Sequence, residues 1–195
     1  MPAPEIREKI LAKASQLFAS KGYDAVSMRH VATEAGMTQA NLYYHFKDKE
    51  DLIRSSLAYV FSGKAQTFET IMQEECDPEK RLERAILWFA TLLFEDAIFA
   101  RLFIRELLVG DNNHLEYLTK NAFQEPFSRM VNLIRDTLNT TDPVLSALFL
   151  SSTILGYFQL SGIAQHLRET RPEYADPKTM TQYLMKEIHK SIKTF

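Results

Sequence analysis

Amide and phenol side chains gather between residues 38 and 49 in a pattern suited to DNA recognition. Gln39 and Asn41 carry amides, which can hydrogen-bond to base edges in the major groove. Tyr43 and Tyr44 carry hydroxyls, which can hydrogen-bond to phosphate oxygens. A solvated helix surface seldom combines adjacent tyrosines with amides and lysines, so this stretch favours a DNA-binding function.

Cations and small hydroxyl side chains flank these four residues. Lys47 and Lys49 follow them and can attract phosphates. Ser27 and Arg29 precede them, and Arg29 is expected to be exposed and to reach the DNA backbone.

Two short helices are needed to position these groups. Ser27 can cap a helix that runs to about Ala35, and Thr38 can cap a second helix that runs to Phe46. Gly36 lies between them, where the turn requires a positive φ that glycine adopts without strain. The sequence therefore predicts a helix-turn-helix, in which the first residues of the second helix meet base edges.

Apolar spacing agrees with this arrangement. Val31, Met37 and Leu42 can share a core between the two helices, and Ala32 is small where they must approach closely. Any pair of short packed helices can show such spacing, so the prediction of DNA binding rests on the surface side chains.

Composition describes an ordinary globular chain. Of 195 residues, 46% are hydrophobic and 25% are charged, and the net charge is −2. The first 50 residues hold seven Lys or Arg against six Asp or Glu, an excess too small to decide for DNA. The single cysteine, Cys76, fits a reducing cytosol and offers no metal cluster. The N-terminus lacks the layout of a signal peptide, so we expect a cytoplasmic protein.

The whole chain is expected to be helical, because no alternating β-branched run stands out. Asp-Pro pairs at 77–78, 142–143 and 176–177 can each cap a helix and begin it with proline. The predicted later helices cover about 78–96, 97–109, 113–139, 143–168 and 177–193, with a kink at Pro126 in the third. Gly22 and Gly110 are expected to end helices.

Residues 143–167 contain no Asp, Glu, Lys or Arg and are numerous enough to span a membrane. Serines, a threonine and glutamines dilute the apolar character of this segment, and amphipathic helices flank it. We therefore interpret it as a buried interface helix, with a membrane-anchored protein as the alternative.

The run from Ala14 to Leu52 resembles the N-terminal signature of the TetR (tetracycline repressor) family. The resemblance rests on Leu17-Phe18, Lys21-Gly22-Tyr23, Ser27, Val31-Ala32, Ala35-Gly36, Leu42-Tyr43-Tyr44-His45-Phe46, Lys47, Lys49-Glu50 and Leu52. The version in residues 41–50 is similar to the branch of multidrug-binding repressors. About the first 55 residues match strongly, and beyond them only the helical layout agrees.

The resemblance implies roles for individual residues. Thr38, Gln39 and Ala40 would open the recognition helix, with Gln39 in direct base contact. Ser27 and Tyr43 would contact phosphates. Tyr44 would join them or pack across a base edge, and Lys49 would anchor a phosphate at the start of the fourth helix.

For the rest of the chain the resemblance implies an all-α fold of about nine helices. Residues 1–50 would form the DNA-binding domain, and residues 51–195 a domain for ligand binding and dimerisation. The expected protein is a homodimer that pairs through its last two long helices, binds a pseudo-palindromic operator in double-stranded DNA and releases it when a small effector binds.

An interior rich in aromatic residues and methionine suits an apolar or planar effector. Such residues at helical spacing also build ordinary cores, so only part of the set is expected to line a cavity. The predicted lining residues are Trp88, Phe89, Leu92, Phe103, Phe123, Phe127, Met130, Phe149, Tyr157 and Phe158. No cofactor and no metal site is expected.

Four polar residues, Arg101, Arg105, Glu106 and His114, lie near one helix junction. They can pair with one another or with a ligand, and ion pairs at the surface or between helices are the simpler interpretation.

Two other function classes stay open. A protein of this fold can organise the chromosome instead of regulating transcription, and it would then bind many scattered genomic sites. An all-α enzyme is the second alternative, although the chain has no nucleophile elbow, no pair of metal ligands at helical spacing and no glycine-rich phosphate loop.

Overall fold

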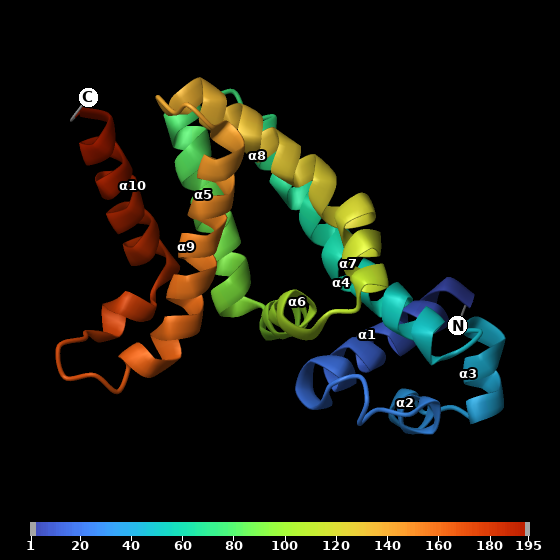
Figure 1. Cartoon of the computed structure of the whole chain (residues 1–195). Coiled ribbons are helices and arrows are strands. Elements are labelled where there is room, and N and C mark those ends of the chain that lie inside the picture. Colours follow the sequence, from blue (N-terminus) through green and yellow to red (C-terminus); the bar gives the residue numbers. More distant parts are fainter. Residues whose placement is uncertain (1–2, 194–195) are drawn as a thin grey trace. The chain divides into compact units, whose positions relative to one another are not determined.

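A computed structural model describes residues 3–193, which form ten α-helices and no strand (Figure 1). The α-helices are α1 (Ala3–Lys21), α2 (Met28–Ala35), α3 (Gln39–His45), α4 (Lys49–Met72), α5 (Pro78–Glu95), α6 (Ala97–Val109), α7 (Asn112–Leu118), α8 (Gln124–Thr137), α9 (Pro143–Ala164) and α10 (Pro177–Lys193). A π-helix, η1 (Thr119–Phe123), precedes α8, and a 3-10 helix, η2 (Pro172–Ala175), precedes α10. The all-α prediction is confirmed.

The predicted helix starts are confirmed by their capping hydrogen bonds. Asp77 accepts from the backbone of residues 79 and 80 at the start of α5, and Asp142 accepts from Leu145 N at the start of α9. The Asp176 carboxylate accepts from Thr179 N at 2.8 Å at the start of α10. Proline occupies the first position of all three helices, where its missing N–H has no intrahelical partner to lose.

The single kinked helix predicted over 113–139 is wrong. The chain forms α7, the π-helix η1 and then α8, so the break precedes Pro126 and gives ten α-helices instead of about nine. Pro126 has no N–H to offer the carbonyl of residue 122, four residues earlier, which interrupts the regular ladder. A π-helical turn accommodates the interruption, as such turns do inside helices.

The helix α9 ends at Ala164, four residues before the predicted end. The Thr170 hydroxyl donates to the Ala164 carbonyl, and His166 N donates to Ile163 O at 2.9 Å in a tighter turn. These bonds satisfy carbonyls that a longer helix would have used.

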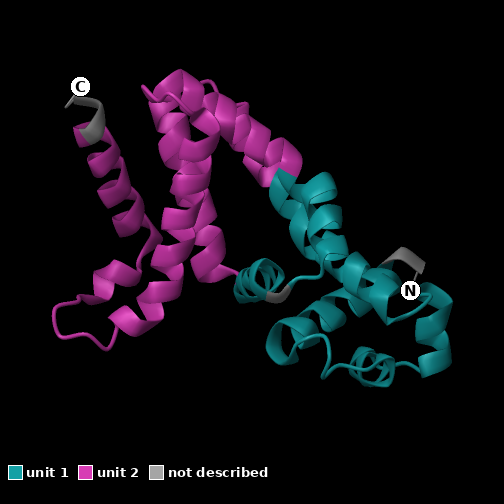
Figure 2. Ribbon diagram, in the orientation of Figure 1, with its two compact units in different colours: residues 1–65, 97–123 teal, residues 66–96, 124–195 magenta. Residues whose placement is uncertain are grey.

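The helices form two compact units (Figure 2). One contains Met1–Ala65 and Ala97–Phe123, and the other contains Gln66–Asp96 and Gln124–Phe195. Neither unit coincides with the predicted division at residue 50, because α6 packs against α1 and joins the first unit.

The first unit has a core that supports the N-terminal helices. Ile10 and Phe18 of α1, Leu42 of α3, Phe46 after it and Leu52 of α4 are all fully buried. Burial of a side chain of this size contributes about 1.5–3 kcal/mol, so these contacts hold the short helices α2 and α3 in place.

The second unit is built around α5, which packs against α8, α9 and α10. Its core residues include Leu82, Ile86 and Leu93 of α5 and Ile134 of α8, each almost fully buried.

The helix α9 is far less buried than a core helix. Only Ala147, Leu150 and Ile154 of it are buried within the chain, which contradicts burial inside one subunit and leaves an interface as the open explanation. Length and composition alone would also let α9 cross a membrane, which is weak evidence for a span.

Two glycines allow a paired test of the turn. Gly36 has φ +71°, whereas Gly63 lies within α4 with open space where a Cβ would be. We expect Gly36→Ala to lower the free energy of unfolding by about 1–2 kcal/mol because L-residues pay for left-handed backbone. Gly63→Ala should raise it by about 0.5–1 kcal/mol, since alanine restricts the unfolded chain and favours helix.

Denaturant unfolding followed by circular dichroism measures both changes. Equal effects of the two substitutions would contradict the assigned role of the Gly36 turn.

Candidate nucleic-acid interface

The turn between α2 and α3 has the geometry that a helix-turn-helix requires. Gly36 adopts left-handed backbone, and Met37 N donates to Ala32 O at 2.9 Å while Gly36 N donates to Thr33 O at 3.0 Å. These two bonds close the end of α2 and turn the chain directly into α3.

The N-terminus of α3 is capped and open to solvent. The Thr38 hydroxyl accepts from Asn41 N at 3.2 Å, as predicted. Thr38, Gln39, Ala40 and Asn41 are all exposed, so their side chains are available to a partner.

The C-terminal half of α3 separates its buried and exposed side chains. Leu42 and Phe46, four residues apart, are buried, whereas Tyr43 is 48% exposed and Tyr44 is 84% exposed. An 84% exposed tyrosine gains little from the core of its own chain. The two phenols therefore lie on the solvent side of the same short helix as the amides.

The flanking residues also lie at the surface. Ser27, Arg29 and Lys47 are exposed, and Lys49 is half-buried at the start of α4. The Ser27 hydroxyl caps α2 by accepting from His30 N at 3.1 Å.

The turn into α4 is fixed by carboxylates. Asp48 accepts from Asp51 N at 2.8 Å, and Asp51 accepts from Lys47 N at 3.0 Å. These bonds orient the backbone that carries Lys47 and Lys49.

Sequence reasoning missed a buried polar cluster beside this surface. The Tyr23 hydroxyl donates to Glu106, and His114 lies between Glu106 and Glu50. Burial and the Glu106 carboxylate raise the pKa of the Tyr23 phenol well above its ordinary value, so the hydroxyl stays protonated and donates. The sequence places Glu106 and His114 near one helix junction, but no local signal links Tyr23 to Glu106, 83 positions away, or Glu50 to His114, 64 positions away.

Comparison with known proteins agrees with this geometry. Residues 10–56 match the family model described as bacterial regulatory proteins, tetR family. This N-terminal domain belongs to the TetR family. The matched segment contains α2, the Gly36 turn and α3, which are the elements that present the exposed side chains.

Two relatives extend the comparison of the TetR-family domain. The HTH-type transcriptional regulator AcrR of Shigella flexneri is 44% identical over 50 residues, which are 26% of this chain and 23% of AcrR. The nucleoid occlusion factor SlmA of Shewanella baltica is 22% identical over 130 residues, which are 67% of this chain and 66% of SlmA. The chain thus matches less than two thirds of either relative.

A solved structure covers almost the whole chain. The crystal structure of AibR in complex with isovaleryl coenzyme A and operator DNA has a TM-score of 0.75 at 16% identity, and the match covers 94% of this chain and 97% of AibR. At this identity the likeness shows the fold alone, and it extends beyond the N-terminal domain.

The predicted effector-binding residues fall into both units of this chain. Phe103 and Phe123 belong to a ring cluster in the first unit, with centroids 5.6 Å apart. Trp88 packs against Phe68 at 5.1 Å in the second unit, where Phe158 also meets Phe94 at 5.1 Å.

Of the other predicted lining residues, Leu92 is buried, and Phe89, Phe127, Met130 and Tyr157 are half-buried. Phe149 is 75% exposed on α9 and therefore lies outside the interior of the single chain. Its position follows from the small buried face of α9, which turns this aromatic side chain to solvent.

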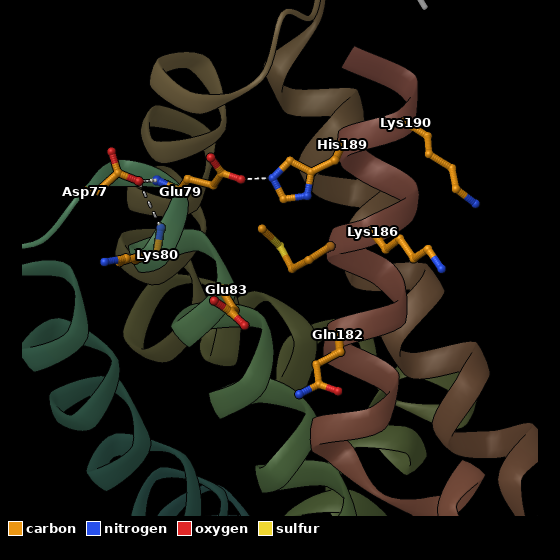
Figure 3. A pocket seen from close by; sticks show the side chains of 9 residues that line it. Asp77, Glu79, Lys80, Glu83, Gln182, Lys186, His189 and Lys190 are labelled. Carbon is orange, nitrogen blue, oxygen red and sulfur yellow. Dashed lines mark hydrogen bonds and ion pairs between the residues drawn. The ribbon is translucent and has the colours of Figure 1, made fainter. Parts of the chain in front are cut away.

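A groove between α5 and α10 in the second unit has a different lining (Figure 3). It is bordered by Asp77, Glu79, Lys80, Glu83, Gln182, Met185, Lys186, His189 and Lys190, with His189 paired to Glu79 across it. None of the predicted effector-binding residues lines this mainly charged groove. Within residues 3–193 no group of three or more His, Cys, Asp or Glu side chains is arranged to hold a metal ion.

Proposed function

We propose that this protein is a transcriptional repressor that binds a pseudo-palindromic operator as a homodimer and releases it when a small effector binds. The observation that carries the proposal is the exposed set of amides and phenols on a capped, seven-residue α3 inside a TetR-family domain. The protein would act in the cytoplasm, on the nucleoid, and without enzymatic activity.

Each exposed residue has a role in this proposal. Gln39 reads a base edge from the first turn of α3, with Ala40 and Asn41 beside it. Tyr43 and Tyr44 meet the backbone or a base edge.

Ser27 and Arg29 contact phosphates ahead of α3, and Lys47 and Lys49 contact them after it. Phosphate contacts fix the register of the helix on the duplex, and the amide contacts give sequence preference.

The dimer would form through α9 and α10. Large apolar side chains on these helices are exposed in the single chain: Val144, Leu145, Leu148, Phe149, Leu160, Ile163 and Tyr183. Monomeric soluble proteins rarely expose apolar patches of this kind, which is typical of a surface that a second copy covers. Two copies would also place two recognition helices about one helical turn apart on DNA.

The effector would be a small molecule with a substantial apolar part. The fold neighbour AibR was solved with isovaleryl coenzyme A and operator DNA together, and this chain carries aromatic clusters in both units. An acyl thioester is therefore the class of ligand to examine first. Release of DNA requires only that the effector bind one conformation more tightly than the other.

A role in chromosome organisation is the second candidate, favoured by the 130-residue match to the nucleoid occlusion factor SlmA. The two functions differ in the distribution of binding sites. A repressor occupies a small number of operators, whereas a chromosome organiser occupies many scattered sites in genome-wide footprinting.

The DNA contacts can be tested on a duplex that the wild-type protein selects from random sequences. We expect Gln39→Ala to bind this duplex at least ten-fold more weakly, because each base contact contributes about 1–3 kcal/mol. Its affinity for non-selected DNA should stay unchanged. Tyr43→Phe should weaken binding to both DNAs, because phosphate contacts carry no sequence information.

Fluorescence anisotropy at matched salt measures these affinities. Gln66→Ala and Tyr59→Phe, which change exposed side chains of α4, are the matched controls. Wild-type affinity of both test variants would contradict the assigned contacts.

The interface can be tested with two exposed apolar residues of similar exposure. Phe149 of α9 is 75% exposed and Leu108 of α6 is 73% exposed. Phe149→Glu should convert the dimer into a monomer and weaken operator binding, because two charges would meet in a desolvated interface. Leu108→Glu should remain dimeric.

Sedimentation equilibrium gives both masses. A dimeric Phe149→Glu variant would exclude this face of α9 from the interface.

The single tryptophan, Trp88, offers a direct readout of effector binding. Titration with isovaleryl coenzyme A and with longer acyl coenzyme A esters should change its emission, because the ring packs against Phe68 in the second unit. The same ligands should weaken operator binding in anisotropy, and free coenzyme A is the control. No change in either measurement would exclude acyl thioesters as the effector class.

A further inference from the structure

Four elements of the first unit meet at one buried polar cluster. Tyr23 lies in the loop between α1 and α2, Glu50 in the first turn of α4, Glu106 in α6 and His114 in α7. The Tyr23 hydroxyl donates to one oxygen of Glu106, and the His114 ring lies between the second oxygen and Glu50. All four elements belong to the same compact unit (Figure 2).

Burial keeps two members of this cluster away from water. Glu106 is 1% exposed and His114 is 5% exposed, so neither can exchange its partner for water without moving. A buried carboxylate is costly unless donors satisfy it, and here Tyr23 supplies one of them. Loss of the Tyr23 donor would leave a second buried oxygen of Glu106 without a hydrogen-bond partner.

His114 has a carboxylate oxygen at each ring nitrogen. Its Nε2 lies 2.9 Å from Glu50 Oε1, and its Nδ1 lies 3.4 Å from Glu106 Oε2. A neutral ring carries one N–H and can donate to only one of them. Only the contact between Nε2 and Glu50 is a hydrogen bond, whereas His114 Nδ1 and Glu106 Oε2 have no hydrogen-bond partner. His114 therefore ties α7 to the first turn of α4 and lies beside Glu106 without bonding to it.

A second contact ties the same loop to α6. A Cβ on Gly22 would come within 2.7 Å of Arg105 Nη1, so the guanidinium lies directly against the backbone that precedes Tyr23. The same guanidinium lies 5.9 Å from the centre of the Tyr23 ring. Neighbouring residues of α6 thus hold neighbouring residues of the loop.

The two ends of the cluster adjoin proposed phosphate contacts. Glu50 directly follows Lys49, and the loop that holds Tyr23 leads into Ser27. We propose that Glu106 and His114 are positioning residues that keep Ser27 and Lys49 in register for DNA, Glu106 through Tyr23 and His114 through Glu50. This proposal rests on the proposed DNA-binding function.

Substitution of Glu50 tests the proposal, because a pure charge effect and a positioning effect would change DNA affinity in opposite directions. Removal of a carboxylate beside Lys49 should strengthen DNA binding if charge alone matters, because less negative charge faces the phosphates. Glu50→Ala should instead weaken binding about ten-fold if His114 holds α4 through it. Glu50 is half-exposed, so the variant is expected to fold. Glu34→Ala, an exposed carboxylate of α2, is the matched control and should bind as wild type or more tightly.

The salt dependence of affinity separates positioning from loss of folded protein. Each lost phosphate contact lowers the slope of log K against log salt by about 0.9, and partial unfolding does not change the slope. Glu50→Ala should lose about 0.9 per subunit, as should Lys49→Ala. The double variant should bind no more weakly than Lys49→Ala alone, because both changes remove the same contact.

The contact between α6 and the loop before α2 is tested by replacing both partners of the hydrogen bond between Tyr23 and Glu106. The double variant Tyr23→Phe with Glu106→Leu leaves no unpaired buried oxygen between them, and apolar replacement of both partners is often nearly neutral for stability. Circular dichroism checks the fold. We expect the same weaker affinity and lower salt slope on the duplex selected by the wild-type protein.

Three results would overturn the proposal: wild-type or tighter binding by Glu50→Ala, an unchanged salt slope, or additive effects of Glu50→Ala and Lys49→Ala. A wild-type protein that selects no duplex would instead refute the proposed function, so the two failures are distinguishable.

Discussion

Burial of Leu42 and Phe46 is the constraint on which the exposed face of α3 depends. The helix α3 has only seven residues, and a helix of this length is unstable alone in water. It exists because these two side chains enter the core of the first unit while Thr38 caps its first turn. The same periodicity places Gln39, Tyr43 and Tyr44 in solvent. Recognition chemistry and stability therefore share one helix without sharing side chains.

The second unit leaves much of one apolar helix uncovered. Its helix α9 buries three residues within the chain and leaves most of its large apolar side chains exposed. Exposed apolar surface opposes solubility unless something covers it. A second copy of the chain would cover this face and bring two recognition helices together, so one surface would serve both stability and DNA affinity.

Local rules predicted more of this molecule than packing rules did. The caps at Ser27, Thr38 and Asp142 and the turn at Gly36 depend on residues within five positions of each other, and all are confirmed. The sequence predicted a kink at Pro126, whereas the helix is interrupted before this residue. The carbonyl that loses its hydrogen bond to proline lies four residues earlier, so the irregular turn forms there. Phe149 was assigned to a pocket because helical spacing identifies a face of a helix without saying what covers it. The polar cluster around Glu106 joins residues far apart in the chain, which no periodicity reveals.

An ionic cluster is a costly way to join helices, and apolar side chains of similar volume often serve stability as well or better. Its hydrogen bonds are directional, and they weaken steeply when the donor angle falls well below about 150°. The Tyr23–Glu106 hydrogen bond therefore favours one placement of the loop before α2 against α6, and the His114–Glu50 hydrogen bond favours one placement of the start of α4 against α7. Contacts that depend on direction in this way suit a regulator that must distinguish two conformations. Apolar contacts lack this directionality, so the proposed positioning role is assigned to the two hydrogen bonds.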